Sequence, residues 1–269
     1  ENGVVSLNGK EGFTIATKKG DFVFKPYMLV QTSANINYYD DEGLDPAYNQ
    51  DNIHNSGFSI PYAILGFTGK AFDRVTFNLS INAAGNGGNI LQQAWFDVEI
   101  KKSFAIRVGK FKTPFSHAYL TTLGETLMPT LPTSLTSSVI LPYSLNAVTP
   151  NIGMGFDLGV EKDKFGYEVG IFNGTGSSVN VASKTFSDDW HIPSLLYAGR
   201  ITYMPKGVMP SNQGSPNRLK EDKMLFGLST SLNVESESES TNDFRAGAEF
   251  AMLKNRLYLG AEIYYMNVG

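Results

Sequence analysis

The sequence has no cysteine among its 269 residues, which excludes disulfide bonds, thiol catalysis and cysteine-ligated zinc. It also lacks an apolar run of the roughly 20 residues that a membrane-spanning helix needs. Histidine is scarce: His54, His117 and His191 lie far apart in expected loops, and no pair has the spacing of metal ligands. We therefore expect neither a metal nor a cofactor.

An excess of positive charge is missing as well. The formal net charge is −4 and the isoelectric point is near 5.5. Proteins that bind nucleic acid usually carry a basic stripe, so we expect no nucleic-acid partner. No Gly-x-Ser-x-Gly motif marks a serine nucleophile. These absences argue against an enzyme.

What the sequence does contain is a recurring alternation of apolar and polar residues. Val75, Phe77, Leu79 and Ile81 alternate with small polar residues, and a second such segment runs over 152–161. A period of two places each set on one face of a strand. Segments of about ten residues are long enough to cross a bilayer as tilted strands. The pattern predicts an all-β protein, an antiparallel transmembrane β-barrel.

The expected strands are separated by connections of two kinds. Short turns fall at 71–72, 101–102, 162–164 and 254–255, whereas the other connections are long and polar. This asymmetry is typical of outer-membrane barrels, although the long connection 205–222 falls where a short turn is expected. The predicted strands, about eleven to twelve in number, cover 12–17, 22–39, 57–69, 73–84, 91–100, 103–112, 151–161, 165–173, 195–204, 223–234, 243–252 and 256–268.

The two faces of these strands differ in charge. The outward sets contain no charged residue, as expected where a Lys or Arg at mid-bilayer costs about 2–4 kcal/mol. The inward sets carry charges of both signs, which predicts a water-filled path with weak ion selectivity. The alternative for each charged side chain is a structural ion pair with a residue of a neighbouring strand. The candidate pore-lining residues are Lys25, Arg74, Arg107, Arg200, Arg245, Asp97, Glu99, Asp157, Glu161, Glu168, Glu249 and Glu262.

A soluble β-sandwich has the same alternation and is the competing fold. Sandwich strands average five to six residues, and the segments here are near ten or longer. In that alternative, Trp95 and Trp190 are candidates for carbohydrate binding. The strand lengths favour the barrel.

The connection 113–150 differs from the other loops. It contains five prolines, many Thr, Ser and Leu residues, and a single formal charge, Glu125. A long apolar loop needs a surface to pack on, and folding back into the barrel interior would supply it. We expect this loop to constrict or plug the pore, with Lys112 and Glu125 as candidate constriction residues.

Several stretches resemble the phosphate-selective porin O and P family. The segment Arg107–Ser116 is similar to the family strand that enters the constricting loop, and 152–159 with 167–174 is similar to the next hairpin, which ends in Phe-Asn-Gly. Ala198–Pro205 and Gly260–Tyr265 resemble two later strands. Together they span about 103–269.

This resemblance implies an outer-membrane porin of a Gram-negative bacterium, with about sixteen strands, embedded in outer-membrane lipid and lipopolysaccharide. It also implies a homotrimer or a subunit of an outer-membrane complex. Because the sequence predicts only about eleven to twelve strands, fewer than the sixteen that the family implies, we expect residues 1–269 to be a single barrel domain whose C-terminal strands are missing.

The expected function is passive diffusion of small hydrophilic solutes or ions. The alternative is a plugged accessory or structural subunit of a larger outer-membrane complex. Selective phosphate transport is a weaker expectation, because a path for phosphate needs many basic side chains and the loop 113–150 contains no Lys or Arg.

Overall fold

The computed structural model describes residues 4–8, 12–37, 55–85, 90–102, 104–126, 151–157, 164–173, 195–210, 213, 222–234, 243–255 and 257–267. These residues form one antiparallel sheet of 13 strands, and every strand pairs with its neighbours in chain order. The strands are β1 (Val4–Asn8), β2 (Gly12–Ala16), β3 (Phe22–Asn37), β4 (Asn55–Ala71), β5 (Val75–Asn82), β6 (Leu91–Lys101), β7 (Phe104–Phe111), β8 (Asn151–Asp157), β9 (Phe165–Phe172), β10 (Leu196–Tyr203), β11 (Lys223–Asn233), β12 (Asp243–Lys254) and β13 (Leu257–Asn267).

The predicted all-β antiparallel fold is confirmed, and the described residues contain one short strand beyond the eleven to twelve expected. The additional strand, β1, is a five-residue segment that pairs with β2, with Val5 opposite Ile15. Its alternation is too short to stand out in the sequence, and its pairing within a hairpin identifies it. The strands β3 and β4 are the longest, with 16 and 17 residues. The end of the expected strand 151–161 lies outside the described residues beyond Asp157.

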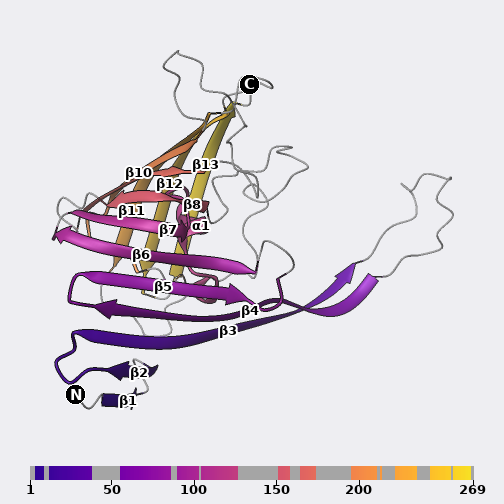
Figure 1. The fold of residues 1–269 in the computed structure, drawn as a ribbon. Helices are drawn as coiled ribbons and strands as arrows, with labels where there is room; N and C mark the ends of the chain where they lie inside the picture. The colour runs from indigo at the N-terminus through magenta and orange to yellow at the C-terminus, as the bar shows by residue number, and fades with distance from the viewer. Residues whose placement is uncertain are drawn as a thin grey trace, which may run out of the picture.

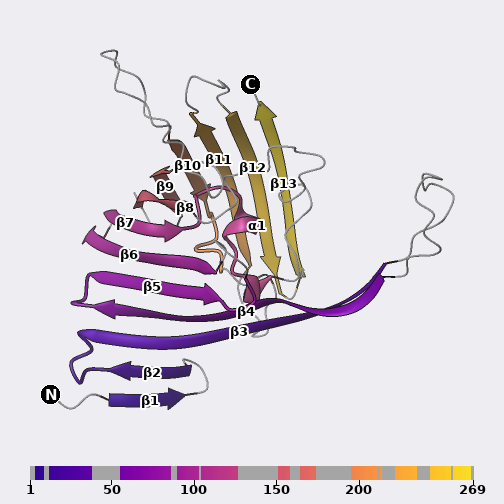
Figure 2. The ribbon, with the colours of Figure 1, turned by 45° about the vertical axis from the view of Figure 1, so that its right-hand side comes forward.

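The sheet curves around a single interior. In Figure 1 the strands β3 to β6 run nearly horizontally, whereas β10 to β13 rise steeply, and Figure 2 shows the short helix α1 (His117–Leu120) between the two groups. The part of the chain that the structure describes has no second sheet packed on the first. The sandwich alternative is therefore wrong: Ile171 and Leu228, core residues in a sandwich, are 41% and 57% exposed on the outer face.

The short turns have the conformation that tight hairpins require. Phe72 and Asp73, between β4 and β5, both have positive φ angles, 52° and 57°, the left-handed conformation that tight hairpin turns use. Asp73 also accepts a hydrogen bond from Lys70 Nζ at 3.0 Å. Asn255, between β12 and β13, has a φ of 55°. The predicted turns at 71–72 and 254–255 are confirmed.

Aromatic side chains form a row on the outer face near the short-turn end. The register aligns Phe165, Tyr203, Phe226 and Phe250 across β9 to β12. The rings of Phe165 and Tyr203 are 4.9 Å apart, and those of Phe226 and Phe250 are 5.3 Å apart. Aromatic rows of this kind lie at the interface between lipid tails and water in membrane barrels.

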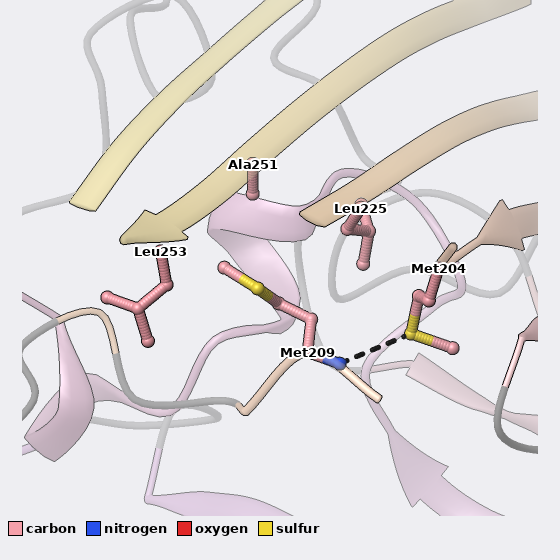
Figure 3. Packing of buried hydrophobic residues seen from close by; sticks show 5 residues of the cluster. All are labelled: Met204, Met209, Leu225, Ala251 and Leu253. Atoms are coloured by element: carbon pink, nitrogen blue, oxygen red, sulfur yellow. Dashed lines mark hydrogen bonds between the residues drawn. The ribbon is translucent and has the colours of Figure 1, made fainter. Parts of the chain in front are cut away.

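The connection after β10 packs against the interior face of the sheet. Figure 3 shows Met204 and Met209 facing Leu225, Ala251 and Leu253, with the backbone N–H of Met209 donating to Met204 Sδ at 3.4 Å. This contact explains why 205–222 departs from the pattern of short turns: its described part turns inward and covers an apolar area. No helix within the described ranges is long and apolar enough to span a membrane.

Candidate functional site

The segment that follows β7 enters the interior. Thr113, Phe115 and Ser116 are buried, and the Phe115 ring stacks on the ring of Tyr264 in β13 at 6.0 Å. Ser116 has a φ of 65° and its side chain accepts a hydrogen bond from the backbone N–H of Tyr119, which begins α1. A loop leaving β7 thus contacts the far side of the sheet. The inward-folding loop is confirmed for its described part, 113–126; residues 127–150 lie outside the described residues.

Glu262 holds this loop against β13. Its carboxylate accepts hydrogen bonds from Ser116 Oγ at 2.7 Å and from the backbone N–H of Ala118 at 2.6 Å. The hydroxyl of Tyr264 donates to the same carboxylate. Hydrogen bonds to a charged acceptor are about twice as strong as those between neutral groups. The glutamate therefore fixes the position of α1 within the interior.

Lys112 stabilises the other end of α1. Its Nζ donates to the carbonyl oxygens of Tyr119 at 2.7 Å and Thr121 at 2.9 Å, and it lies 5.2 Å from the centre of the Tyr119 ring. Burial lowers the pKa of Lys112 to about 8, an effect that the nearby Glu125 opposes. A cation is favourable at a helix C-terminus because the last carbonyls there carry partial negative charge.

An ion pair lies on the interior face beneath α1. Arg200 in β10 donates to Glu249 in β12 through Nε at 2.9 Å and through a second nitrogen at 2.8 Å. The pair spans β11, and Gly227 leaves the room for it, since a Cβ at that position would lie 2.6 Å from Glu249 Cγ. This pair is bidentate and almost fully buried.

His117, the first residue of α1, lies close enough to this pair to be affected by its charges. Burial lowers the pKa of His117, and the positive charge of Arg200 lowers it further, while Glu249 acts in the opposite direction. His117 therefore favours its neutral form, in which it adds no charge to the buried pair.

A cavity of about 500 Å³ separates the inward loop from the wall of the sheet. Within it, Arg107 donates to Asp97 Oδ2 from Nε at 3.2 Å and from a second nitrogen at 2.9 Å. The guanidinium carbon lies 4.2 Å from the centre of the Trp95 ring. The polar residues that line the cavity are Tyr27, Asn78, Ser80, Gln92, Gln93, Asp97, Arg107, Lys112, Thr122 and Glu168.

The structure separates the expected pore-lining residues into groups. Asp97, Arg107 and Glu168 line the cavity, together with Lys112. Arg200, Arg245, Glu249 and Glu262 face the interior at positions largely buried or covered by the loop, and Arg245 is fully buried. Lys25, Arg74 and Glu99 do not line this cavity. Arg74 and Glu99 are exposed, with Arg74 in the turn before β5. The Asp157 side chain and Glu161 lie outside the described residues.

Of the two expected constriction residues, Lys112 contacts the loop backbone as described. The carbonyl oxygen of Glu125 accepts a hydrogen bond from the backbone N–H of Gln213 at 2.9 Å. Gln213 belongs to the connection after β10. The loop after β7 and this connection therefore meet inside the sheet.

The candidate residues taken from the sequence were all charged, and the neutral polar ones were missed. Asn78 and Ser80 alternate with apolar residues in β5, and Gln93 alternates with Ala94 in β6, so the period of two places them on the interior face. By contrast, no local pattern indicates that Ser116 contacts β13, because that contact depends on the path of the loop.

Comparison with known proteins supports these observations. The family model described as phosphate-selective porin O and P matches residues 30–269, which is nearly the whole chain. Among curated proteins, none matches the chain.

Proposed function

The chain belongs to the phosphate-selective porin O and P family and is an outer-membrane porin of Gram-negative bacteria, and on this premise we propose that it admits small hydrophilic solutes by passive diffusion with weak ion selectivity. The family is one of channels, not enzymes. The inward loop narrows the path, and the residues around the cavity contact the passing solute.

The observation that carries this proposal is the pairing of charges on the interior face. Asp97 is bonded to Arg107, and Arg200 is bonded to Glu249. Opposite charges at such short distances cancel most of each other's field a few ångströms away. Strong anion selectivity needs a ring of basic side chains, and the cavity lining contains two basic residues and two acidic ones. Ions of both signs should therefore pass.

A second candidate function is a plugged accessory subunit of a larger outer-membrane complex. The contact between Glu125 and Gln213 favours it, because two connections that enter the interior meet there. The buried side chains of Met204, Met209 and Leu253 also occupy part of the same interior. A plugged barrel would not conduct.

Liposome swelling separates these two functions. Vesicles that contain the purified protein are diluted into isotonic solutions of uncharged solutes of increasing size. A porin gives swelling rates that fall steadily with solute size. Swelling no faster than in protein-free vesicles contradicts the porin proposal and favours the plugged subunit.

We also propose that the barrel assembles as a homotrimer in contact with outer-membrane lipid and lipopolysaccharide. The apolar outer face supports contact with lipid, since Met28 and Ile263 are exposed there. Light scattering of the detergent-solubilised protein gives the number of subunits, and a monomer contradicts the trimer.

A further inference from the structure

We propose that the cavity between the inward loop and β3 to β9 is a binding site for a neutral, polyhydroxylated solute of the sugar class, and that it does not bind phosphate. This inference deepens the proposed porin function by naming the solute class of the same interior. It rests on the charges, hydrogen-bonding groups and apolar surface of the cavity.

The charges of the cavity are already compensated. Arg107 is bonded to Asp97, and Lys112 donates to the carbonyl oxygens of the loop. Glu168 lies opposite Arg200 in the register of β9 and β10. Phosphate carries up to two negative charges at neutral pH and needs cations that are available to it. Both cations of the lining have partners within the protein, so an anion would have to displace them.

The hydrogen-bonding groups suit hydroxyls. Both bonds from Arg107 end on Asp97 Oδ2, so the other carboxylate oxygen, Oδ1, takes no part in this ion pair. The amide side chains of Asn78 and Gln93 line the same cavity. An amide offers both a donor and an acceptor, and a hydroxyl is also both. Groups of this kind can bind hydroxyls without any net charge on the ligand.

The cavity also offers aromatic surface. Tyr27 is 39% exposed and lines the cavity, and its hydroxyl is hydrogen-bonded to Asn78 at 3.3 Å. Trp95 lines it as well, and its Nε1 donates to Gln93 at 2.9 Å, which orients that amide. The C–H faces of a sugar ring pack against aromatic rings, whereas a phosphate gains nothing from them. The volume of about 500 Å³ is within the range of small-molecule sites and accepts a small saccharide.

Tryptophan fluorescence tests this inference directly. The chain has two tryptophans, Trp95 and Trp190, so Trp190→Phe leaves Trp95 as the only reporter. The full chain carrying this change, in detergent, is titrated with maltose and, separately, with inorganic phosphate at constant ionic strength. We expect a saturable change in emission with maltose and none with phosphate.

Three further variants locate the site, each made in the Trp190→Phe background. Gln93→Ala removes an amide from the interior face and should weaken maltose binding by about tenfold, the loss of roughly one hydrogen bond. Phe96→Leu changes the outer face of the same strand and should leave binding unchanged. Asp97→Asn releases Arg107 from its carboxylate and should weaken maltose binding while it creates binding of phosphate. If one interior variant does not fold, the other still tests the site.

The outcomes separate this inference from the porin proposal. Saturable binding of phosphate by the parent protein, or no response to either solute, overturns the sugar site even where the protein conducts ions. Binding of maltose by a protein that neither conducts nor swells vesicles supports the site and contradicts the porin proposal. Equal loss of binding in Gln93→Ala and Phe96→Leu also overturns the site.

Discussion

Glu262 in β13 accepts a hydrogen bond from Ser116, a residue of the loop that follows β7. The two residues are 146 positions apart in the chain, and their contact crosses the interior of the barrel. The same carboxylate also accepts from the N–H of Ala118. The position of the inward loop therefore depends on one acidic side chain of the wall.

Glu262→Gln should loosen the loop. The change removes the charge that strengthens these hydrogen bonds, each worth about 1.5–3 kcal/mol when the acceptor is ionised. We expect a larger single-channel conductance with more current noise, and faster proteolysis within the loop. Ile263→Val, on the outer face next to it, is the matched control. Conductance and noise equal to those of the parent protein would show that Glu262 does not hold the loop.

Gly227→Ala should separate Arg200 from Glu249. The added Cβ would lie 2.6 Å from Glu249 Cγ and Cδ, so the carboxylate must move. Breaking a buried ion pair costs about 3–5 kcal/mol, and thermal unfolding in detergent should shift to lower temperature.

Gly199→Ala is the control for this change, because its Cβ would meet no described atom closer than 3.6 Å. It should leave the unfolding temperature nearly unchanged. Equal shifts in the two variants would indicate a general effect of alanine in these strands.

Arg107 and Arg200 should differ in their effect on ion selectivity. The Arg107 side chain is 39% exposed in the cavity, whereas that of Arg200 is 10% exposed. Arg107→Gln leaves Asp97 unpaired beside the path and should shift the reversal potential toward cation preference. Arg200→Gln should lower stability with a smaller effect on selectivity. A larger shift of the reversal potential in Arg200→Gln would contradict the assignment of the cavity as the path.

Acidification should loosen the loop through His117. Burial and Arg200 lower the pKa of His117 in the folded protein below its ordinary value of about 6.5. The undocked loop then binds a proton more readily than the docked loop, so docking is stable above about pH 6.5 and weakens as the pH falls toward the lowered pKa.

Current noise should therefore rise between about pH 7 and pH 5. In His117→Asn the noise should depend less on pH. A parent channel whose noise is the same across this range contradicts the role of His117.

Much of the fold follows from the sequence, because a period of two is a local property of each strand. The outward positions of Ile171, Leu228 and Ile263 were all predicted in this way, and each is exposed. The brief β1 was missed because five residues give too little periodicity, and the inward path of the connection after β10 was missed because it depends on packing against Leu225 and Leu253.

The site was less predictable than the fold. Alternation shows that Arg107 and Arg200 face the interior, but it does not show that the loop covers Arg200 and leaves Arg107 beside a cavity. That distinction depends on the contacts of Glu262 with Ser116 and Ala118, which join segments far apart in the chain. Tertiary contacts of this kind have no local signature.

We propose above all that the protein is an open, weakly selective channel in which Arg107 is paired with Asp97 and Arg200 with Glu249. The most direct test is the reversal potential of the purified full-length protein in a planar bilayer under a KCl gradient. We expect steady channel openings and a reversal potential close to zero. A reversal potential near the Nernst potential of chloride or of potassium, or a bilayer in which no channel opens, would contradict this account.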